Sequence, residues 1–497
     1  MKHKPKIIAI VFFTFLITTC SQPQPAGIPE HLLEIVEANR AIALPPFPDD
    51  FAERADIFLT QGLTSGEDLR ISKEKSQVRI PGQHIREIRP ENNPVASISQ
   101  EDATKDITFL FDLMKYGYAG YQYFGGDEIF LPIRNSMLER LANMPEVITG
   151  TTLLRDILVP GLGPVIADNH FQLHDVTLEA PRLSARINEE FVLRKINDDF
   201  ITVIDTVEYK FVEATFLEQK VDGILPTLTR GGEVVFVFGH FAAWDQLGPK
   251  PLSVLLENVE SGKRRLLEVR LQVMASPGMD TIVFHESKRN GIPVVVNRTL
   301  QDPYLTIDAT KTFYESGESL RGSPVIVLDL RGHSGGISSS MENWIYGLTG
   351  NRPSGRAFEI FSLVSRTADR FTGSLPIWTK STFSEVLTLP LSNKNLVIVL
   401  TDTNMASAGD LIVGHLREFE NVVFVGTNTR GMLVTGEIVR NVLPRSNITV
   451  VFGTQLHLRP DFSQFEGVGF LPDLWVPPTE SLERVLAFIE RYGLANR

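Results

Sequence analysis

Ser407 stands where a nucleophile could act. The apolar run Leu396–Leu400 predicts a buried strand, and the helical spacing that follows places Ser407 in the turn that opens a helix. A second apolar run, Val422–Val425, completes a unit of strand, turn, helix and strand. A helix N-terminus has free backbone N–H groups, here including that of Ala408, which could hold an oxyanion. The serine could instead cap the helix, because Asp410 three residues later completes a capping-box pattern.

A glycine-rich turn could supply the other half of an oxyanion hole. The buried strand that is predicted from Val325 runs through Arg331 directly into the turn Gly332–Gly336. This turn has neither G-x-G-x-x-G nor a following G-K-[ST], so a nucleotide-binding loop is not indicated. The backbone N–H of Gly335 or Gly336 is therefore a candidate donor to an oxyanion, and a plain strand-to-helix turn is the alternative.

Charge and residue spacing exclude several classes of partner. The chain has 497 residues and a net charge of −12, whereas binding to phosphate backbones needs a basic surface, so nucleic acid is not expected. The histidines and acids show no metal-ligand spacing such as H-E-x-x-H, so neither a metal nor another cofactor is predicted. The sequence does not indicate an oligomeric state.

The first twenty residues have the pattern of an export signal. The basic segment MKHKPK precedes the apolar run IIAIVFFTFLITT, which is too short to span a bilayer comfortably. The run ends at Cys20, the only cysteine, and Ile17–Cys20 resembles a bacterial lipobox with an unusual Thr19. An ordinary secretory signal is the alternative. We therefore expect export to the bacterial cell envelope and a lipid anchor on Cys20, at the periplasmic or outer-membrane face. The residue after this cysteine is Ser21 and not an aspartate, which favours the outer membrane.

The elements that must position these residues form a multi-domain α/β (α+β) protein. The predicted regions are a signal peptide at 1–20, a tether and N-terminal segment at 21–100, a helical subdomain at 101–177, a β-rich module at 178–290 and an α/β core at 291–497. The helical subdomain ends in the tripeptide Asp168–His170. A tyrosine-rich cluster between Tyr116 and Phe124 is expected to pack between helices.

Four blocks of the α/β core share their order and rough spacing with a known family. These blocks, within Gly291–Pro478, are Asp329–Gly336, Ser407–Asp410, Gly426–Gly431 and Glu466–Asp473. They resemble the tail-specific (C-terminal-processing) serine peptidase family. The resemblance implies a core of the ClpP/crotonase-like fold, a nucleophile at Ser407 and protein or peptide substrates. It also places the β-rich module at the position of a PDZ domain, although the module lacks a recognisable glycine-containing carboxylate-binding loop.

One residue departs from the Ser–Lys members of that family, whose lysine follows the glycine that aligns with Gly431. Met432 stands there, and no lysine occurs after Lys394, so a Ser–Lys dyad from this block is excluded. The tricorn-core branch instead uses serine, histidine and glutamate. The resemblance to that branch assigns the role of general base to His170 and the role of its carboxylate partner to Glu466.

Alternatives remain for both assignments and for the function. His174, His333 and His457 are rival bases, and His170 is preferred on the position of its block alone. Glu466 could be a solvated turn residue. A catalytically inactive binding protein or scaffold at the cell envelope is the rival function, and convergence of Ser407 and His170 within hydrogen-bond distance discriminates between the two.

Overall fold

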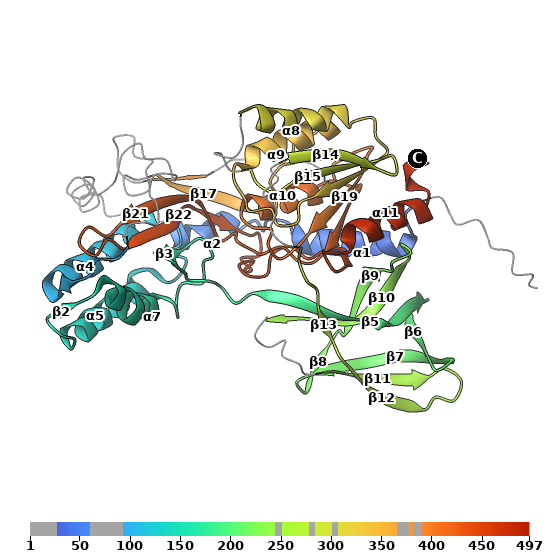
Figure 1. Ribbon diagram of the computed structural model, residues 1–497, viewed down its shortest axis with the longest axis horizontal. Helices are drawn as coiled ribbons and strands as arrows, with labels where there is room; N and C mark the ends of the chain where they lie inside the picture. Colours follow the sequence, from blue (N-terminus) through green and yellow to red (C-terminus); the bar gives the residue numbers. More distant parts are fainter. Residues whose placement is uncertain are drawn as a thin grey trace, which may run out of the picture.

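The computed structural model describes residues 27–59, 93–243, 251–277, 284–300, 307–364, 377–380 and 389–496. The predicted signal peptide and Cys20 lie outside the described residues. Figure 1 shows an α/β core, a second sheet covered by helices, and an all-β module that projects from one side of the core. This arrangement confirms the predicted class, a multi-domain α/β protein.

The core is built on a six-stranded sheet that is parallel except at one edge. Its strands, in spatial order, are β14 (Phe284–Arg289), β15 (Ile292–Asn297), β16 (Val325–Asp329), β19 (Leu396–Thr401), β20 (Val422–Gly426) and β23 (Leu474–Trp475). Only β14 is antiparallel to its neighbour, and Val325 of β16 lies opposite Leu396 of β19. Both faces of the central strands are buried, which explains their uninterrupted apolar runs.

Helices cover both faces of this sheet. The helices on one face are α8 (Ile307–Ser319), α9 (Ser338–Thr349) and α10 (Ala408–Arg417), and those on the other are α1 (Glu30–Ala43) and α11 (Ser481–Arg491). Alternate strand residues divide between the two layers: Ile326 packs with the first set of helices, and Val327 packs with the second. The short helix η2 (Leu494–Asn496) packs on the core, whereas α2 (Phe51–Leu59) packs on a second sheet.

A second, antiparallel sheet extends from the core. Its strands are β18 (Ile377–Lys380), β17 (Glu359–Val364), β22 (Thr449–Leu458), β3 (Gln172–Leu173) and β4 (Val176–Thr177), with β21 (Thr435–Val442) also paired to β22. The predicted helical subdomain packs on this sheet through side chains such as Val450 and Phe452. Its elements are β1 (Ile98–Ser99), α4 (Gln100–Gly117), α5 (Gly126–Ala142), β2 (Val147–Ile148), α6 (Gly150–Thr152), the π-helical η1 (Leu153–Leu158) and α7 (Val159–Leu162).

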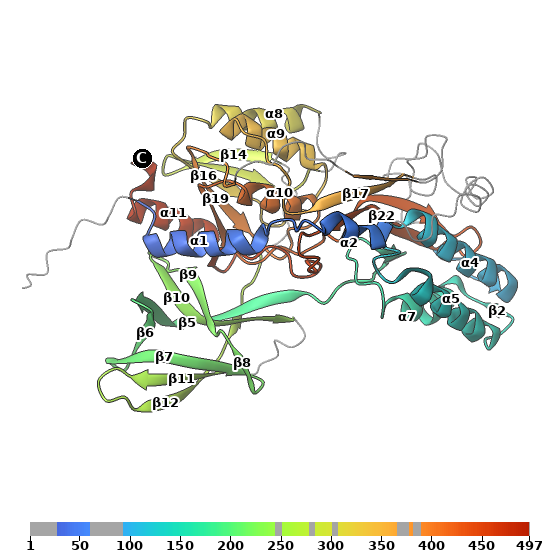
Figure 2. The ribbon, with the colours of Figure 1, turned by 180° about the vertical axis from the view of Figure 1, so that it is seen from behind.

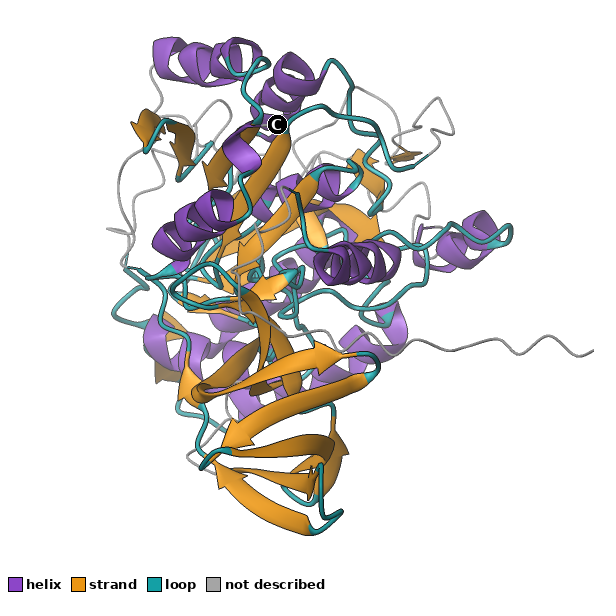
Figure 3. Cartoon of the chain, turned by 90° about the vertical axis from the view of Figure 1, so that its right-hand side faces the viewer, coloured by secondary structure: helices purple, strands orange, loops and turns teal. Residues whose placement is uncertain are grey.

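The β-rich module is an antiparallel sheet with no helix among its described residues, as Figure 3 shows. Its strands are β5 (Leu183–Ile196), β6 (Asp199–Ile204), β7 (Val207–Phe216), β8 (Gln219–Val221), β9 (Ile224–Leu228), β10 (Val234–Ala243), β11 (Leu252–Asn258), β12 (Arg264–Val269) and β13 (Gln272–Val273). Strand β14 lies in the predicted range of this module, but it pairs with β15. The sheet of the core therefore begins at Phe284, before the predicted boundary at residue 291.

Candidate active site

Ser407 lies after β19, immediately before α10, in a strained backbone conformation. Its φ of 57° and ψ of −120° are unusual for a residue with a side chain and cost about 1–3 kcal/mol. The serine side chain makes no capping hydrogen bond among the described residues, so the alternative role of Ser407 as a side-chain cap is not supported. The Asp410 carboxylate accepts from the backbone N–H of Gly431 at 3.0 Å and of Met432 at 3.1 Å. The Ser407 hydroxyl is thus left available for another partner.

That partner is His170, whose Nε2 lies 3.1 Å from Ser407 Oγ. The loop that carries His170 connects α7 to β3 and is fixed from several sides. Asn169 Nδ2 donates to the carbonyl of Gly431 at 3.0 Å, and its Oδ1 accepts from Ala180 N–H at 3.1 Å. The structure therefore brings a residue of the helical subdomain to the carboxyl edge of the core sheet, where ligands collect in open α/β folds.

The environment of His170 keeps its imidazole neutral. The ring is buried, and burial together with the nearby Arg430 guanidinium lowers the pKa of His170 to about 4. A neutral imidazole can accept the proton of a serine hydroxyl. The second ring nitrogen, Nδ1, is buried and has no hydrogen-bond partner among the described residues, and Asp168 Oδ1 lies 4.0 Å from it.

Glu466 is buried beside this loop, but its carboxylate has other partners. One oxygen accepts from Asn169 N–H at 2.7 Å, and the other accepts from Leu433 N–H and Val434 N–H, each at 2.7 Å. No hydrogen bond joins Glu466 to His170 among the described contacts, which corrects the predicted pairing. Backbone N–H groups in irregular buried segments need acceptors, and this carboxylate accepts hydrogen bonds from three such N–H groups. Burial and the neighbouring Asp168 raise the pKa of Glu466.

The glycine turn after β16 lies against Ser407. A Cβ placed on Gly335, whose φ is +100°, would lie 2.9 Å from Ser407 Cβ. The Gly335 N–H, however, donates to His333 Nδ1 at 3.1 Å, so it is not free for an oxyanion, contrary to the prediction. The N–H groups of Gly336 and Ala408 have no hydrogen-bond partner among the described residues. These two groups are the remaining candidate donors.

The rival histidines make no described contact with Ser407. His333 is occupied by the Gly335 N–H, and burial lowers its pKa to about 3. His457 lies buried in β22, and neither of its ring nitrogens has a hydrogen-bond partner in the part of the chain that the structure describes. Burial and the nearby His170 lower its pKa to about 3. His174 lies in the tight turn between β3 and β4.

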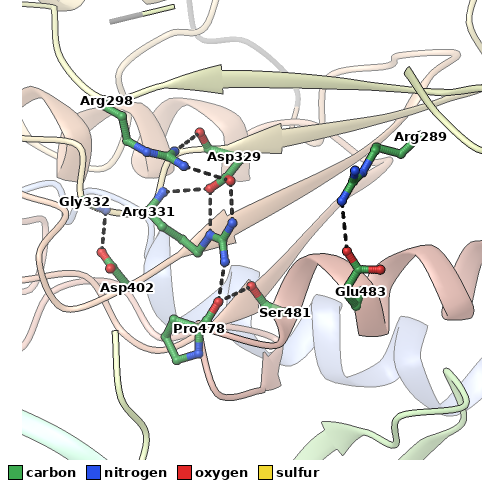
Figure 4. A network of polar contacts seen from close by, with 9 residues as sticks. All are labelled: Arg289, Arg298, Asp329, Arg331, Gly332, Asp402, Pro478, Ser481 and Glu483. Carbon is green, nitrogen blue, oxygen red and sulfur yellow. Dashed lines mark hydrogen bonds and ion pairs between the residues drawn. The ribbon is translucent and has the colours of Figure 1, made fainter. Parts of the chain in front are cut away.

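A network of charged residues holds the glycine turn in place (Figure 4). Asp329, at the end of β16, accepts from Arg331 Nε at 2.8 Å and from Arg298 at 3.0 Å. Burial alone would raise the pKa of Asp329, but the two arginines outweigh burial and lower it. Asp402, after β19, accepts from Gly332 N–H at 2.8 Å, which ties the two strand ends together. Sequence pattern did not predict this network, although the pair Asp329 and Arg331 at the end of a predicted strand was a signal for it.

A second missed group surrounds Asp168. Its Oδ1 accepts from His170 N–H at 2.9 Å, and its Oδ2 accepts from Tyr118 Oη and Thr435 Oγ1, each at 2.8 Å. The tyrosine-rich cluster does pack against a helix as expected, since the ring of Tyr121 lies stacked 4.6 Å from that of Phe130 in α5. One hydroxyl of that cluster nevertheless reaches the site, and no sequence pattern indicated it.

The α/β core indicates the class of protein. Residues 299–476, within this core, match the model of peptidase family S41, and the core is that of a tail-specific serine peptidase. No curated protein matches the sequence. In the part of the chain that the structure describes, no group of three or more His, Cys, Asp and Glu side chains could hold a metal, and no helix is long and apolar enough to cross a membrane.

Solved structures with a similar chain course include three named peptidases. Mature CPAF in complex with lactacystin is 13% identical with a TM-score of 0.40, over 79% of this chain and 97% of CPAF. The photosystem II D1 C-terminal processing protease is 13% identical with a TM-score of 0.35, over 78% and 97% of the two chains. The tricorn protease is 13% identical with a TM-score of 0.34, over 79% of this chain and 37% of tricorn.

Proposed function

We propose that this serine peptidase is an endopeptidase of the serine–histidine type, in which Ser407 is the nucleophile and His170 is the general base. The observation that carries the proposal is the 3.1 Å separation between Ser407 Oγ and His170 Nε2. Met432 supports it, because a thioether at the position of the family lysine cannot accept a proton. The same contact argues against the rival function, a catalytically inactive binding protein.

The chemistry follows from the arrangement of these groups. His170 Nε2 takes the Ser407 hydroxyl proton as Oγ attacks the scissile carbonyl, and the protonated ring then gives that proton to the leaving amine. The carbonyl oxygen becomes an oxyanion, which the N–H groups of Ala408 and Gly336 would bind. Loss of one such donor typically costs about 3 kcal/mol of transition-state stabilisation. Water then hydrolyses the acyl-enzyme by the reverse sequence of proton transfers.

The strained backbone of Ser407 is consistent with this role. Non-glycine residues with positive φ gather at functional sites, where the surrounding structure holds them in place. Here the turn is held by Asp410 on one side and by the Gly335 turn on the other. The hydroxyl is thereby directed toward His170 and away from the N–H groups of its own helix.

Cleavage of a protein substrate tests this proposal. An unfolded protein would be incubated with the purified chain, with Ser407→Ala, with His170→Ala and with His285→Ala, a control in which an exposed histidine of β14 is removed. We expect cleavage by the wild type and the control, and none above background by the other two. Activity in folded Ser407→Ala, or full activity in His170→Ala, would contradict the assigned roles.

We further propose that the protein is exported and carries a lipid on Cys20. The support is in the sequence alone: a basic start, a short apolar run and the only cysteine at its end. Expression in a bacterial host with a radiolabelled fatty acid tests the anchor. We expect label on the wild-type chain and none on Cys20→Ser, which should also leave the membrane fraction. Equal labelling of both chains would contradict lipidation at this cysteine.

A further inference from the structure

We propose that Asp168, and not Glu466, is the carboxylate that positions the His170 imidazole and stabilises its protonated form during attack. This inference rests on the proposed function, because it assumes that His170 is the base. It assigns Asp168 the role of a positioning residue that acts through His170, two residues away along the same loop.

The contacts of Asp168 orient its carboxylate toward His170. Tyr118 Oη and Thr435 Oγ1 both donate to Oδ2, at 2.8 Å each, so that Oδ1 is the oxygen that faces the histidine. Oδ1 accepts from His170 N–H at 2.9 Å and lies 4.0 Å from His170 Nδ1. The carboxylate is fully buried, so its charge acts on the ring with little screening by water.

The surroundings of Asp168 are built to hold this geometry. Tyr118 lies fully buried against Phe171 and Phe452, and Gly120 leaves the space that its hydroxyl occupies. A Cβ on Gly120 would lie 2.5 Å from Tyr118 Oη. Burial raises the pKa of Asp168, and the three hydrogen-bond donors on its carboxylate favour the charged form and offset part of that rise.

The proton arrangement of His170 requires such a partner. For Nε2 to accept the Ser407 proton, the neutral ring must carry its own proton on Nδ1. Among the described residues that Nδ1 has no hydrogen-bond partner, and Asp168 Oδ1 is the carboxylate oxygen that lies 4.0 Å from it. Catalytic hydrogen bonds are often long in the absence of substrate and shorten when it binds.

The Glu466 carboxylate binds backbone N–H groups and makes no described contact with the His170 ring. Its two oxygens already accept three backbone N–H groups, which come from Asn169, Leu433 and Val434. A turn of this carboxylate toward His170 would strip buried donors of their acceptor, at about 1–3 kcal/mol for each. Glu466 thus fixes the loop on which His170 lies, while Asp168 faces the ring.

The charge balance of the step is complete within these residues. The Ser407 proton moves to Nε2, and the ring becomes an imidazolium ion opposite the Asp168 carboxylate, which keeps its charge throughout. The proton then passes to the leaving amine, and the ring returns to its neutral form. In the described part of the chain, the other charged or titratable groups that act on the ring are Arg430, which disfavours its protonation, and His457, while Glu466 acts on Asp168.

Two near-isosteric variants separate these roles. Asp168→Asn keeps an oxygen for the His170 N–H but removes the charge, and Glu466→Gln is the matched change at the other carboxylate. The full chain in detergent would be reacted with a fluorophosphonate probe, and the second-order labelling rate would be measured beside the thermal unfolding midpoint. We expect Asp168→Asn to slow labelling on the order of 10²- to 10³-fold. We expect Glu466→Gln to change the labelling rate less than Asp168→Asn does, and mainly to lower the thermal unfolding midpoint.

The protonation equilibrium of His170 supplies a readout that a structural role would not change. In chains labelled with [15N]histidine and reacted with the probe, we expect Asp168→Asn to lower the pKa of the His170 imidazolium by at least about one unit. Tyr118→Phe keeps the charge but frees Oδ2, and a labelling rate lower by about tenfold is expected. This second variant keeps the inference testable where Asp168→Asn does not fold.

Two results would overturn the inference. The first is wild-type labelling and an unchanged pKa of His170 in folded Asp168→Asn, or in Tyr118→Phe where the former does not fold. The second is a drop of that pKa in Glu466→Gln alone. Failure of the proposed function would look different, because His170→Ala would then label at the wild-type rate. Unlabelled His170→Ala beside a fully active Asp168→Asn refutes only the role of Asp168.

Discussion

Gly335→Ala should disable the nucleophile by displacing it. An alanine Cβ at this position would lie 2.9 Å from Ser407 Cβ and 3.4 Å from Ser407 Oγ, whereas ordinary contacts of a Cβ begin at 3.4 Å. Opening the first contact from 2.9 to 3.4 Å requires a relative shift of 0.5 Å. The φ of +100° at Gly335 adds strain of about 1–3 kcal/mol for any residue with a side chain.

The expected loss of activity follows from that shift. Reacting groups must be placed to within a fraction of an ångström, and a misplacement of about 1 Å can cost about 10²-fold in rate. We therefore expect Gly335→Ala to label with a fluorophosphonate probe roughly 10- to 100-fold more slowly than the wild type. Its free energy of unfolding should also fall, because the strain and the contact both oppose folding.

Gly332→Ala is the matched control, because it lies in the same turn and also has a positive φ. Its φ is +71°, and a Cβ there would meet nothing within 4 Å. We expect a smaller loss of stability, from backbone strain alone, with an unchanged labelling rate. Equal rates for the two variants, whether both slow or both normal, would refute the reasoning that contact with Ser407 is what makes Gly335 necessary.

Three further predictions concern charged or polar groups around the site. Arg430→Gln should raise the pKa of His170 from about 4, because the Arg430 charge and burial both lower that pKa in the wild type. The acid limb of the pH profile of kcat/KM should therefore move to higher pH by up to about one unit. The free energy of unfolding of His457→Leu should rise relative to that of the wild type as pH falls below 6.5, by about 2 kcal/mol at pH 5. The reason is that the folded wild type keeps His457 neutral, with a pKa of about 3, whereas the unfolded chain binds a proton at a pKa of 6.5. Asp410→Asn should lower the free energy of unfolding by about 1–3 kcal/mol in urea titrations, because an amide cannot accept from both the Gly431 and the Met432 N–H.

Each of these predictions has a contrary outcome. An acid limb that stays in place in Arg430→Gln would mean that burial alone sets the pKa of His170. A stability difference for His457→Leu that is the same at pH 7 and pH 5 would mean that His457 is protonated in the folded chain. Urea midpoints that match for Asp410→Asn and the wild type would mean that the two backbone N–H groups find other acceptors.

The sequence predicted the fold class and the elements around the nucleophile because those follow from local pattern. The apolar run Leu396–Leu400 forms β19, and the segment with helical spacing after Ser407 forms α10. A strand buried on both faces has an uninterrupted apolar run, and a helix buried on one face has apolar residues at helical spacing, so both can be recognised in the sequence. The family resemblance that rests on the four blocks indicated His170. That histidine lies 237 positions before the serine that it contacts, and no periodicity could have linked the two.

The details of the site depended on competition among hydrogen bonds, which a sequence does not reveal. Gly335 has the N–H that an oxyanion needs, but His333 Nδ1 accepts from it. Glu466 has the right side chain, but three backbone donors occupy it. Asp168 faces His170 because Tyr118 and Thr435 orient it, and those residues come from distant segments. Loop conformation decides such contacts.

The most direct test of the central claim is to map the site of covalent modification. The purified chain would be reacted with a fluorophosphonate, digested, and examined by mass spectrometry, with His170→Ala treated in parallel. The account predicts one phosphonylated peptide that contains Ser407, and a large loss of that adduct in His170→Ala. A folded wild type that remains unmodified, or a modification at another residue, would contradict the assignment of Ser407 as the nucleophile.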